Sequence, residues 1–169
     1  MFSHTNPGSA NPQHGHPRMA LGFALAGALL LAAGCEDANA PGVPTATTQA
    51  IKERRANYRR IGDAFKAIGD SIESGSADSA LVREGARSIR DTGARQTALF
   101  VAGSGITSGA KTRAREAVWT DEATFAQRHR DFLAATDALV AAEPADFGMR
   151  YQALKDACLA CHDTFRERR

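Results

Sequence analysis

Two cysteines and a histidine near the end of the chain have the types and spacing for cofactor chemistry. The sequence there runs Cys158-Leu159-Ala160-Cys161-His162. Cysteines three residues apart share one helical turn, so both thiols can add to the two vinyl groups of one haem while the adjacent imidazole reaches its iron. This CxxCH pattern is the attachment sequence of c-type haem. It predicts one covalently bound haem per chain, with His162 as the metal ligand.

Two other interpretations of the motif are weaker. A redox-active CxxC pair normally lies at the start of a helix that follows a strand, whereas this pair lies deep in a helical pattern. A zinc site needs more ligands, and His129 is the only other histidine outside the polar leader. Export also favours haem, because c-type haem is attached outside the cytoplasm, where an unmodified pair is prone to form a disulfide.

The first part of the chain is typical of an export signal. Arg18 precedes an apolar run over residues 19–33, which is shorter than the roughly 20 residues of a membrane-spanning helix and ends in small residues. Its end is similar to the lipobox of bacterial lipoproteins, in which the cysteine is acylated: Ala32, Ala33, Gly34 and Cys35. We expect lipidation of Cys35, with an ordinary signal peptide cleaved nearby as the alternative. Glu36 favours an outer-membrane anchor that faces the periplasm.

Three regions are expected along the chain. Residues 1–34 form the predicted lipoprotein signal, and residues 35–48, which are rich in Ala, Pro and Thr, suit a flexible tether. Residues 49–169 are enough for one modest domain. With 21 basic and 19 acidic residues the net charge is +2, too small for the field that non-specific nucleic-acid binding needs. No nucleic-acid partner is expected.

Four stretches repeat apolar residues at steps of three and four, the period of an amphipathic helix. The first runs from about 49 to 74, and the second follows the capping residue Asp78 and ends at Gly103. The third runs from Thr120 to Pro144, and the last from residue 146 to about 166. Four such helices with mostly short links predict an all-α fold, an antiparallel four-helix bundle with a covalent haem site near its C-terminus.

Four marks along the chain carry a resemblance to a known family. The most specific mark is the sequence from Cys158 to Arg166. Its CxxCH motif lies seven residues from the C-terminus, at the end of the four helices. The supporting marks are Arg59-Arg60 ahead of the 65–69 segment, Phe100 with Gly103, and Ala117-Val118-Trp119. Together they are similar to the cytochrome c′ family, the class II c-type cytochromes, over about residues 48–169.

The resemblance implies roles for the residues around the haem. Cys158 and Cys161 would form the thioether bonds, and His162 would be the proximal iron ligand. Arg166, one turn later, would lie beside the proximal imidazole, and one arginine of the Arg59-Arg60 pair would lie near a haem propionate. The resemblance also implies a homodimer formed through the first two helices.

The sixth coordination position of the iron decides the function. A Met at the distal position of the first helix would give a low-spin electron carrier, whereas an apolar residue leaves the iron five-coordinate. Alignment on residues 66–69 puts Phe65 at that position, and counting from Arg59 puts Asp63 there. Phe65 fits the apolar face, with Ile61 as a pocket neighbour, so we expect Phe65 and five-coordinate iron.

These observations predict an exported haem protein that binds small gases such as NO and CO, transfers single electrons, or does both. The alternative is a low-spin, six-coordinate electron-transfer cytochrome of the periplasm. Lys66, Met149 and His129 are the weaker candidates for its sixth ligand. The redox partner protein stays unidentified. Two basic clusters, Lys111 with Arg113 and Arg115, and Arg128 with Arg130, usually mean solvated faces, and their docking to an acidic partner is a minority interpretation. No Ser, His and Asp set can be assembled, so an enzyme is not expected.

Overall fold

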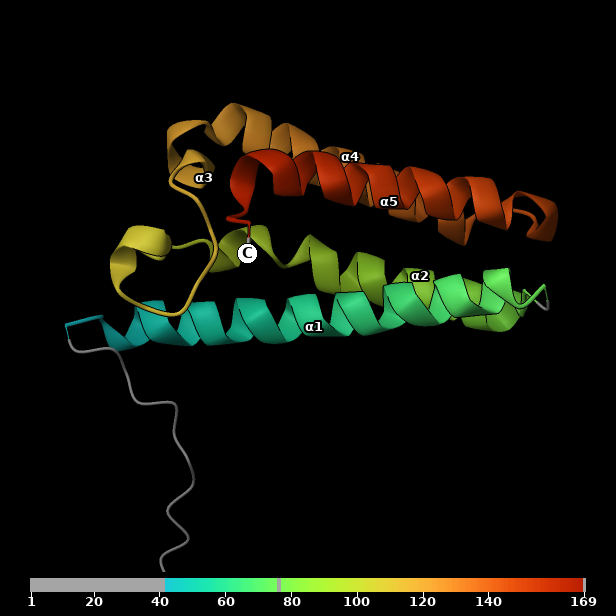
Figure 1. Cartoon of the computed structure of the whole chain (residues 1–169), viewed down its shortest axis with the longest axis horizontal. Helices are drawn as coiled ribbons and strands as arrows, with labels where there is room; N and C mark the ends of the chain where they lie inside the picture. Colours follow the sequence, from blue (N-terminus) through green and yellow to red (C-terminus); the bar gives the residue numbers. More distant parts are fainter. Residues whose placement is uncertain (1–41, 76, 169) are drawn as a thin grey trace, which may run out of the picture. The chain divides into compact units, whose positions relative to one another are not determined.

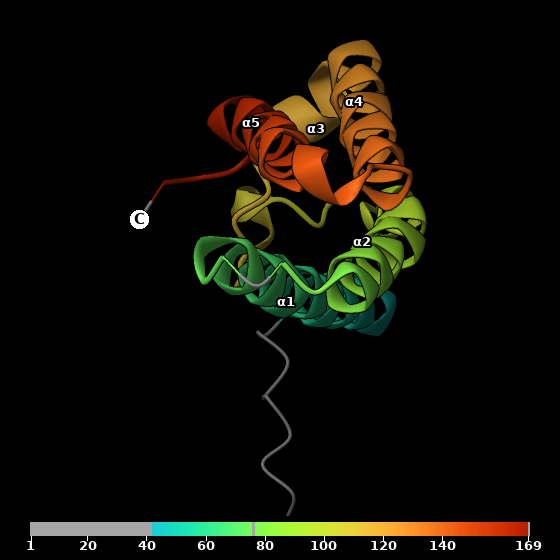
Figure 2. The same ribbon diagram turned by 90° about the vertical axis from the view of Figure 1, so that its right-hand side faces the viewer.

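Four helices in two layers form the fold. The structure, a computed structural model, describes residues 42–75 and 77–168. Its long helices are α1 (Thr45–Glu73), α2 (Ser79–Ala94), α4 (Glu122–Val140) and α5 (Phe147–Phe165). The short ones are η1 (Thr97–Leu99), η2 (Ile106–Ser108), α3 (Ala117–Thr120) and η3 (Pro144–Asp146). Helices α1 and α2 form one layer, and α4 and α5 the other (Figures 1 and 2). The described residues contain no strand, and the predicted all-α four-helix bundle is confirmed.

The helix ends follow the predicted signals, except at the end of α2. The Asp78 carboxylate caps α2 by accepting hydrogen bonds from the backbone N–H groups of Ala80 and Leu81. The second helix was expected to reach Gly103 but ends at Ala94. In the sequence, apolar residues such as Phe100 continue the helical pattern beyond Ala94. In the structure Phe100 lies in a loop and is apolar because it packs edge-on to Phe125, with the ring centroids 4.9 Å apart.

Helix α1 begins at Thr45, inside the segment predicted to be a tether. The predicted signal, its lipobox and Cys35 lie outside the described residues. Within residues 42–75 and 77–168, no helix is long and apolar enough to cross a membrane.

Two groups of buried side chains hold the helices together. The larger lies between all four long helices and consists of Ile68, Val82, Ala86, Ile89, Leu139, Ala142, Phe147 and Leu154. The smaller joins the start of α3 to the end of α5 and consists of Ala114, Val118 and Phe165. Helix α1 packs along α2, α2 along α4, and α4 along α5, whereas α1 and α5 approach each other less closely.

A buried arginine attaches α1 to the long loop between α2 and α3. The Arg54 side chain is 3% exposed. Its guanidinium donates to the Leu99 carbonyl at 3.2 Å, to both oxygens of Ser104 at 3.0 and 2.9 Å, and to Thr112 Oγ1 at 2.8 Å. It also lies over the Phe100 ring, 4.4 Å from the centroid. Burial lowers the pKa of Arg54, and these contacts offset the cost of burying its charge.

Replacing Arg54 by Lys tests this attachment. A lysine cannot reproduce the planar fork of donors, so buried oxygen acceptors of the loop would lose their partners. We expect Arg54→Lys to lower the free energy of unfolding by about 2–3 kcal/mol, measured by urea denaturation. The exposed neighbour provides the control, Arg55→Lys, which should change stability by less than about 0.5 kcal/mol. Equal effects of the two changes would contradict the anchoring role.

Candidate haem site

One face of α5 carries the residues of the CxxCH motif into the bundle. Phe147, Leu154 and Phe165 are buried on this face, and their spacing of 7 and 11 residues keeps them in line on a helix. Cys158 packs against the larger core group and Cys161 against the smaller. Both thiols are unpaired.

Burial keeps the two thiols protonated. Desolvation, together with the nearby Cys161, raises the pKa of Cys158 to about 11. Desolvation also raises the pKa of Cys161, although the positive charge of Arg128 opposes the shift. A redox-active pair needs a thiol pKa below its ordinary value. The local environment therefore disfavours the redox interpretation of the motif.

The imidazole of His162 lies against arginines at the end of α5. Arg166 Nη1 is 3.2 Å from His162 Nδ1 and 3.5 Å from Nε2. Burial and, next, the charge of Arg113 lower the pKa of His162, while Asp163 raises it. The neutral imidazole that this favours is the form that binds a metal.

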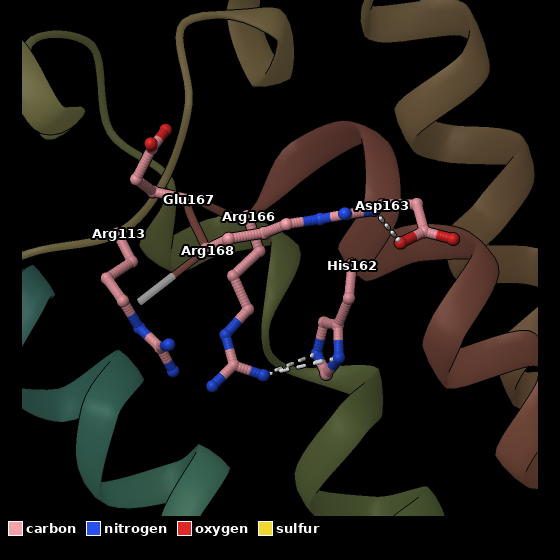
Figure 3. A pocket seen from close by; sticks show the side chains of 6 residues that line it. All are labelled: Arg113, His162, Asp163, Arg166, Glu167 and Arg168. Carbon is pink, nitrogen blue, oxygen red and sulfur yellow. Dashed lines mark hydrogen bonds and ion pairs between the residues drawn. The ribbon is translucent and has the colours of Figure 1, made fainter.

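A recess of about 410 Å³ opens beside this imidazole. It is lined by Arg113, His162, Asp163, Arg166, Glu167 and Arg168. In Figure 3 the Arg113 and Arg166 guanidinium groups extend in the same direction as the His162 ring. Two backbone hydrogen bonds hold this arrangement, from Arg115 N–H to the Phe165 carbonyl at 3.0 Å and from Glu167 N–H to the Arg113 carbonyl at 2.8 Å.

Tyr58 is an α1 side chain on whose ionisation the cysteines act. Both Cys161 and Cys158 act electrostatically on its phenol, and desolvation is the largest cause of its raised pKa. Yet 42% of the side chain is accessible. Sequence analysis did not select Tyr58, although it shares the apolar face of Ile51 and Ile61.

The residues predicted for the distal side, Phe65 and Ile61, pack on the same core group as Cys158. Phe65 stacks on Tyr151 with the ring centroids 4.4 Å apart, and Tyr151 precedes Cys158 by seven residues. Ile61 packs with Phe65 against the larger core group, which Cys158 also contacts. Phe65 as the distal residue stays a prediction.

Of the four arginines of the first helix, one side chain is buried and three are exposed. Arg59 and Arg60 are exposed, and Arg60 donates to Asn57 Oδ1 at 3.1 Å. Neither has a described contact with the CxxCH motif, so the propionate role of this pair stays a prediction. The buried arginine is Arg54, which sequence analysis missed. Its signal was a charge placed on the apolar stripe, three residues after Ile51 and four before Tyr58.

The site has the donor set that a covalently attached haem requires. It offers two unpaired thiols on one turn and a neutral imidazole beside them. In addition, the buried Nε of Arg128 has no hydrogen-bond partner, and the positive charge of Arg128 acts to lower the pKa of Cys161. An unsatisfied buried donor suits a site that a cofactor completes. For zinc, the described residues provide no group of three or more His, Cys, Asp or Glu side chains, and His129 Nε2 lies 3.0 Å from the Gly93 carbonyl.

A four-helix bundle with CxxCH in its last helix defines a class of c-type haem proteins. The model of the family Cytochrome C′ matches residues 49–166, and the chain belongs to this family. Similar solved structures include cytochrome c′ from Rhodopseudomonas palustris, 29% identical, covering 72% of this chain and 98% of that one, with a TM-score of 0.64. For cytochrome c′ from Rubrivivax gelatinosus the identity is 26%, the coverage 72% and 97%, and the TM-score 0.65. Comparison with curated protein sequences gave no match.

Family membership makes the cofactor haem c. Cys158 and Cys161 would hold it through thioether bonds, and His162 would bind the iron. Haem supplies an iron that changes oxidation state and binds small ligands. The chain itself keeps the imidazole neutral and fixes its surroundings through Arg166 and the backbone pairing of the C-terminal tail.

Removal of both thiols tests the attachment. In Cys158→Ser/Cys161→Ser no thioether bond can form, so we expect complete loss of haem from the denatured polypeptide, measured by haem staining of a denaturing gel. Leu159→Ser, an exposed position between the cysteines, should retain the stain. Haem that stays on the doubly substituted chain would show that other residues attach it.

Proposed function

We propose that this protein binds small uncharged gases, NO and CO, at a five-coordinate haem and undergoes one-electron redox there, acting as a binding protein and not as an enzyme. The observation that carries the proposal concerns the sixth ligand. The sequence left Lys66, His129 and Met149 as weaker candidates for this ligand, and the surroundings of each are against the role. Lys66 pairs with Asp70, which raises the pKa of Lys66 and keeps it protonated. His129 bonds the Gly93 carbonyl, and Met149 is 58% exposed.

The Tyr58 phenol supports the same conclusion. Its raised pKa keeps it neutral at ordinary pH, and a neutral phenol is a poor ligand for iron compared with Met or His. A related structure is compatible with gas binding. A variant of cytochrome c′ from Alcaligenes xylosoxidans has carbon monoxide bound. It is 21% identical, covers 72% of this chain and 97% of that one, and has a TM-score of 0.64.

Absorption spectra test the proposed coordination. The chain would be produced with c-type haem maturation proteins and examined in the ferric and ferrous states, before and after addition of CO and NO. We expect a broad high-spin ferrous Soret band that responds to both gases. Sharp low-spin α and β bands that CO does not change would instead indicate the alternative, a six-coordinate electron-transfer cytochrome.

The proposal extends to location and assembly. The predicted acylation of Cys35 would anchor the protein to the outer membrane, facing the periplasm. Helices α1 and α2 would form a homodimer interface. Their shared surface has a groove lined by small residues, an exposed leucine and two acidic residues: Ala64, Ala67, Asp78, Ala80, Leu81, Glu84 and Gly85. One related cytochrome c′ is described as having an unusual ligand-controlled dimer dissociation.

A charge placed in the groove tests the dimer. Leu81 is 40% exposed, and a carboxylate there would face its own symmetry copy or nearby apolar groups. We expect Leu81→Glu to shift the mass in sedimentation equilibrium from dimer to monomer. Met149→Glu, on the exposed part of α5, should leave the mass unchanged. A wild-type protein that is monomeric at micromolar concentration would refute this part of the proposal.

A further inference from the structure

The first half of α1 carries a stripe of positive charge on its outward face. Lys52, Arg55 and Arg59 follow one another at steps of three and four residues, so they share one side of the helix. All three are exposed, whereas Arg54 and Asn57 are buried on the opposite side. Helix α1 itself forms an edge of the bundle, away from α4 and α5 (Figures 1 and 2).

The three charges of this basic stripe have no partner within the described part of the chain. The ion pairs found there join other residues, and no hydrogen bond involves Lys52, Arg55 or Arg59. Glu53 and Arg60, of opposite charge, each follow a stripe residue and lie about 100° round the helix. Like charges at steps of three and four repel each other along a helix. The stripe is therefore available to a negative surface outside the domain.

The second half of the same helix has a different charge pattern. Lys66 lies two turns after Arg59 and pairs with Asp70, one turn further on. Asp63 and Glu73 add acidic side chains to this half. Positive charge without a partner is thus confined to the first half of the outward face.

The predicted acylation site lies shortly before the basic half of α1. The helix begins at Thr45, ten residues after Cys35. A segment of that length reaches at most about 35 Å when fully extended. Lys52 follows two turns into the helix, so acylation of Cys35 would keep the basic stripe near the membrane surface.

We infer that the basic stripe of Lys52, Arg55 and Arg59 binds the anionic phospholipid surface of the membrane in which the protein is anchored. The inference rests on the proposed acylation and adds an orientation, with the first half of α1 facing the membrane. Each basic side chain near an anionic lipid surface strengthens binding about fivefold. The groove proposed for the dimer contains none of the three residues, so the two contacts use different side chains.

Amine labelling on vesicles tests this contact. The four lysines of the chain are all exposed, so one acylating reagent compares them within the same molecule: Lys52, Lys66, Lys111 and Lys155. The mature holoprotein would be mixed with vesicles of phosphatidylcholine and phosphatidylglycerol, or of phosphatidylcholine alone. Labelling rates would be measured by mass spectrometry.

We expect Lys52 to react about three- to tenfold more slowly on the anionic vesicles. Its reactivity should recover at about 1 M salt, where the Debye length falls to about 3 Å. Lys66, in the acid-paired half of α1, should change less than about twofold. Lys155, on α5, should react equally fast on both kinds of vesicle.

A pair of double variants shows whether the stripe itself causes the protection. Arg55→Gln/Arg59→Gln removes two of its charges and leaves Lys52 as the reporter, so most of the protection should disappear. Arg87→Gln/Arg150→Gln removes the same charge from exposed positions on α2 and α5 and should keep it. Protection that survives the first change, or that both changes abolish equally, overturns the inference.

Vesicle flotation separates this inference from the proposed anchor. A protein that floats with both kinds of vesicle, but whose Lys52 reacts equally fast on both, overturns the inference and leaves the anchor in place; a stripe that binds an acidic protein instead gives this result. Flotation with the anionic vesicles alone, abolished by salt and accompanied by protection of Lys52, refutes the anchor and supports the lipid contact. A protein that floats with neither kind overturns both.

Discussion

The burial of one face of α5 is the constraint on which the site depends. Phe147, Leu154 and Phe165 each lose nearly all contact with solvent, and burying such large side chains contributes about 1.5–3 kcal/mol each. Their alignment fixes the rotation of α5 about its axis. Because Cys158 and Cys161 lie on the same face, this rotation also turns both thiols into the bundle. Packing energy therefore determines the placement of the groups that attach the cofactor.

The buried charge of Arg54 links the position of α1 to the position of the loop on the other side of the site. Arg54 holds the loop after α2 at Leu99, Ser104 and Thr112. This loop continues into the residues that pair with the C-terminal tail, where Arg113 accepts from Glu167. The arginines around His162 thus depend on a hydrogen-bond network that begins on the opposite helix. Apolar packing alone would not set this loop, since it contains few buried apolar side chains.

Periodicity and one motif predicted most of the architecture but only part of the site. The helices follow from apolar residues at steps of three and four, and CxxCH identifies its chemistry by residue type and spacing alone. The rotation of α1 was harder to predict. Ile51, Tyr58, Ile61 and Phe65 share one face, so periodicity alone does not say which of them meets the cysteines. That choice depends on how far α1 extends beside α5, a tertiary property.

The charge beside His162 fits the proposed role. Arg113 and Arg166 place positive charge beside the imidazole. Positive charge stabilises the state with one more electron, which is the ferrous state that binds CO. The positive charge beside the imidazole would therefore favour the oxidation state on which CO binding depends.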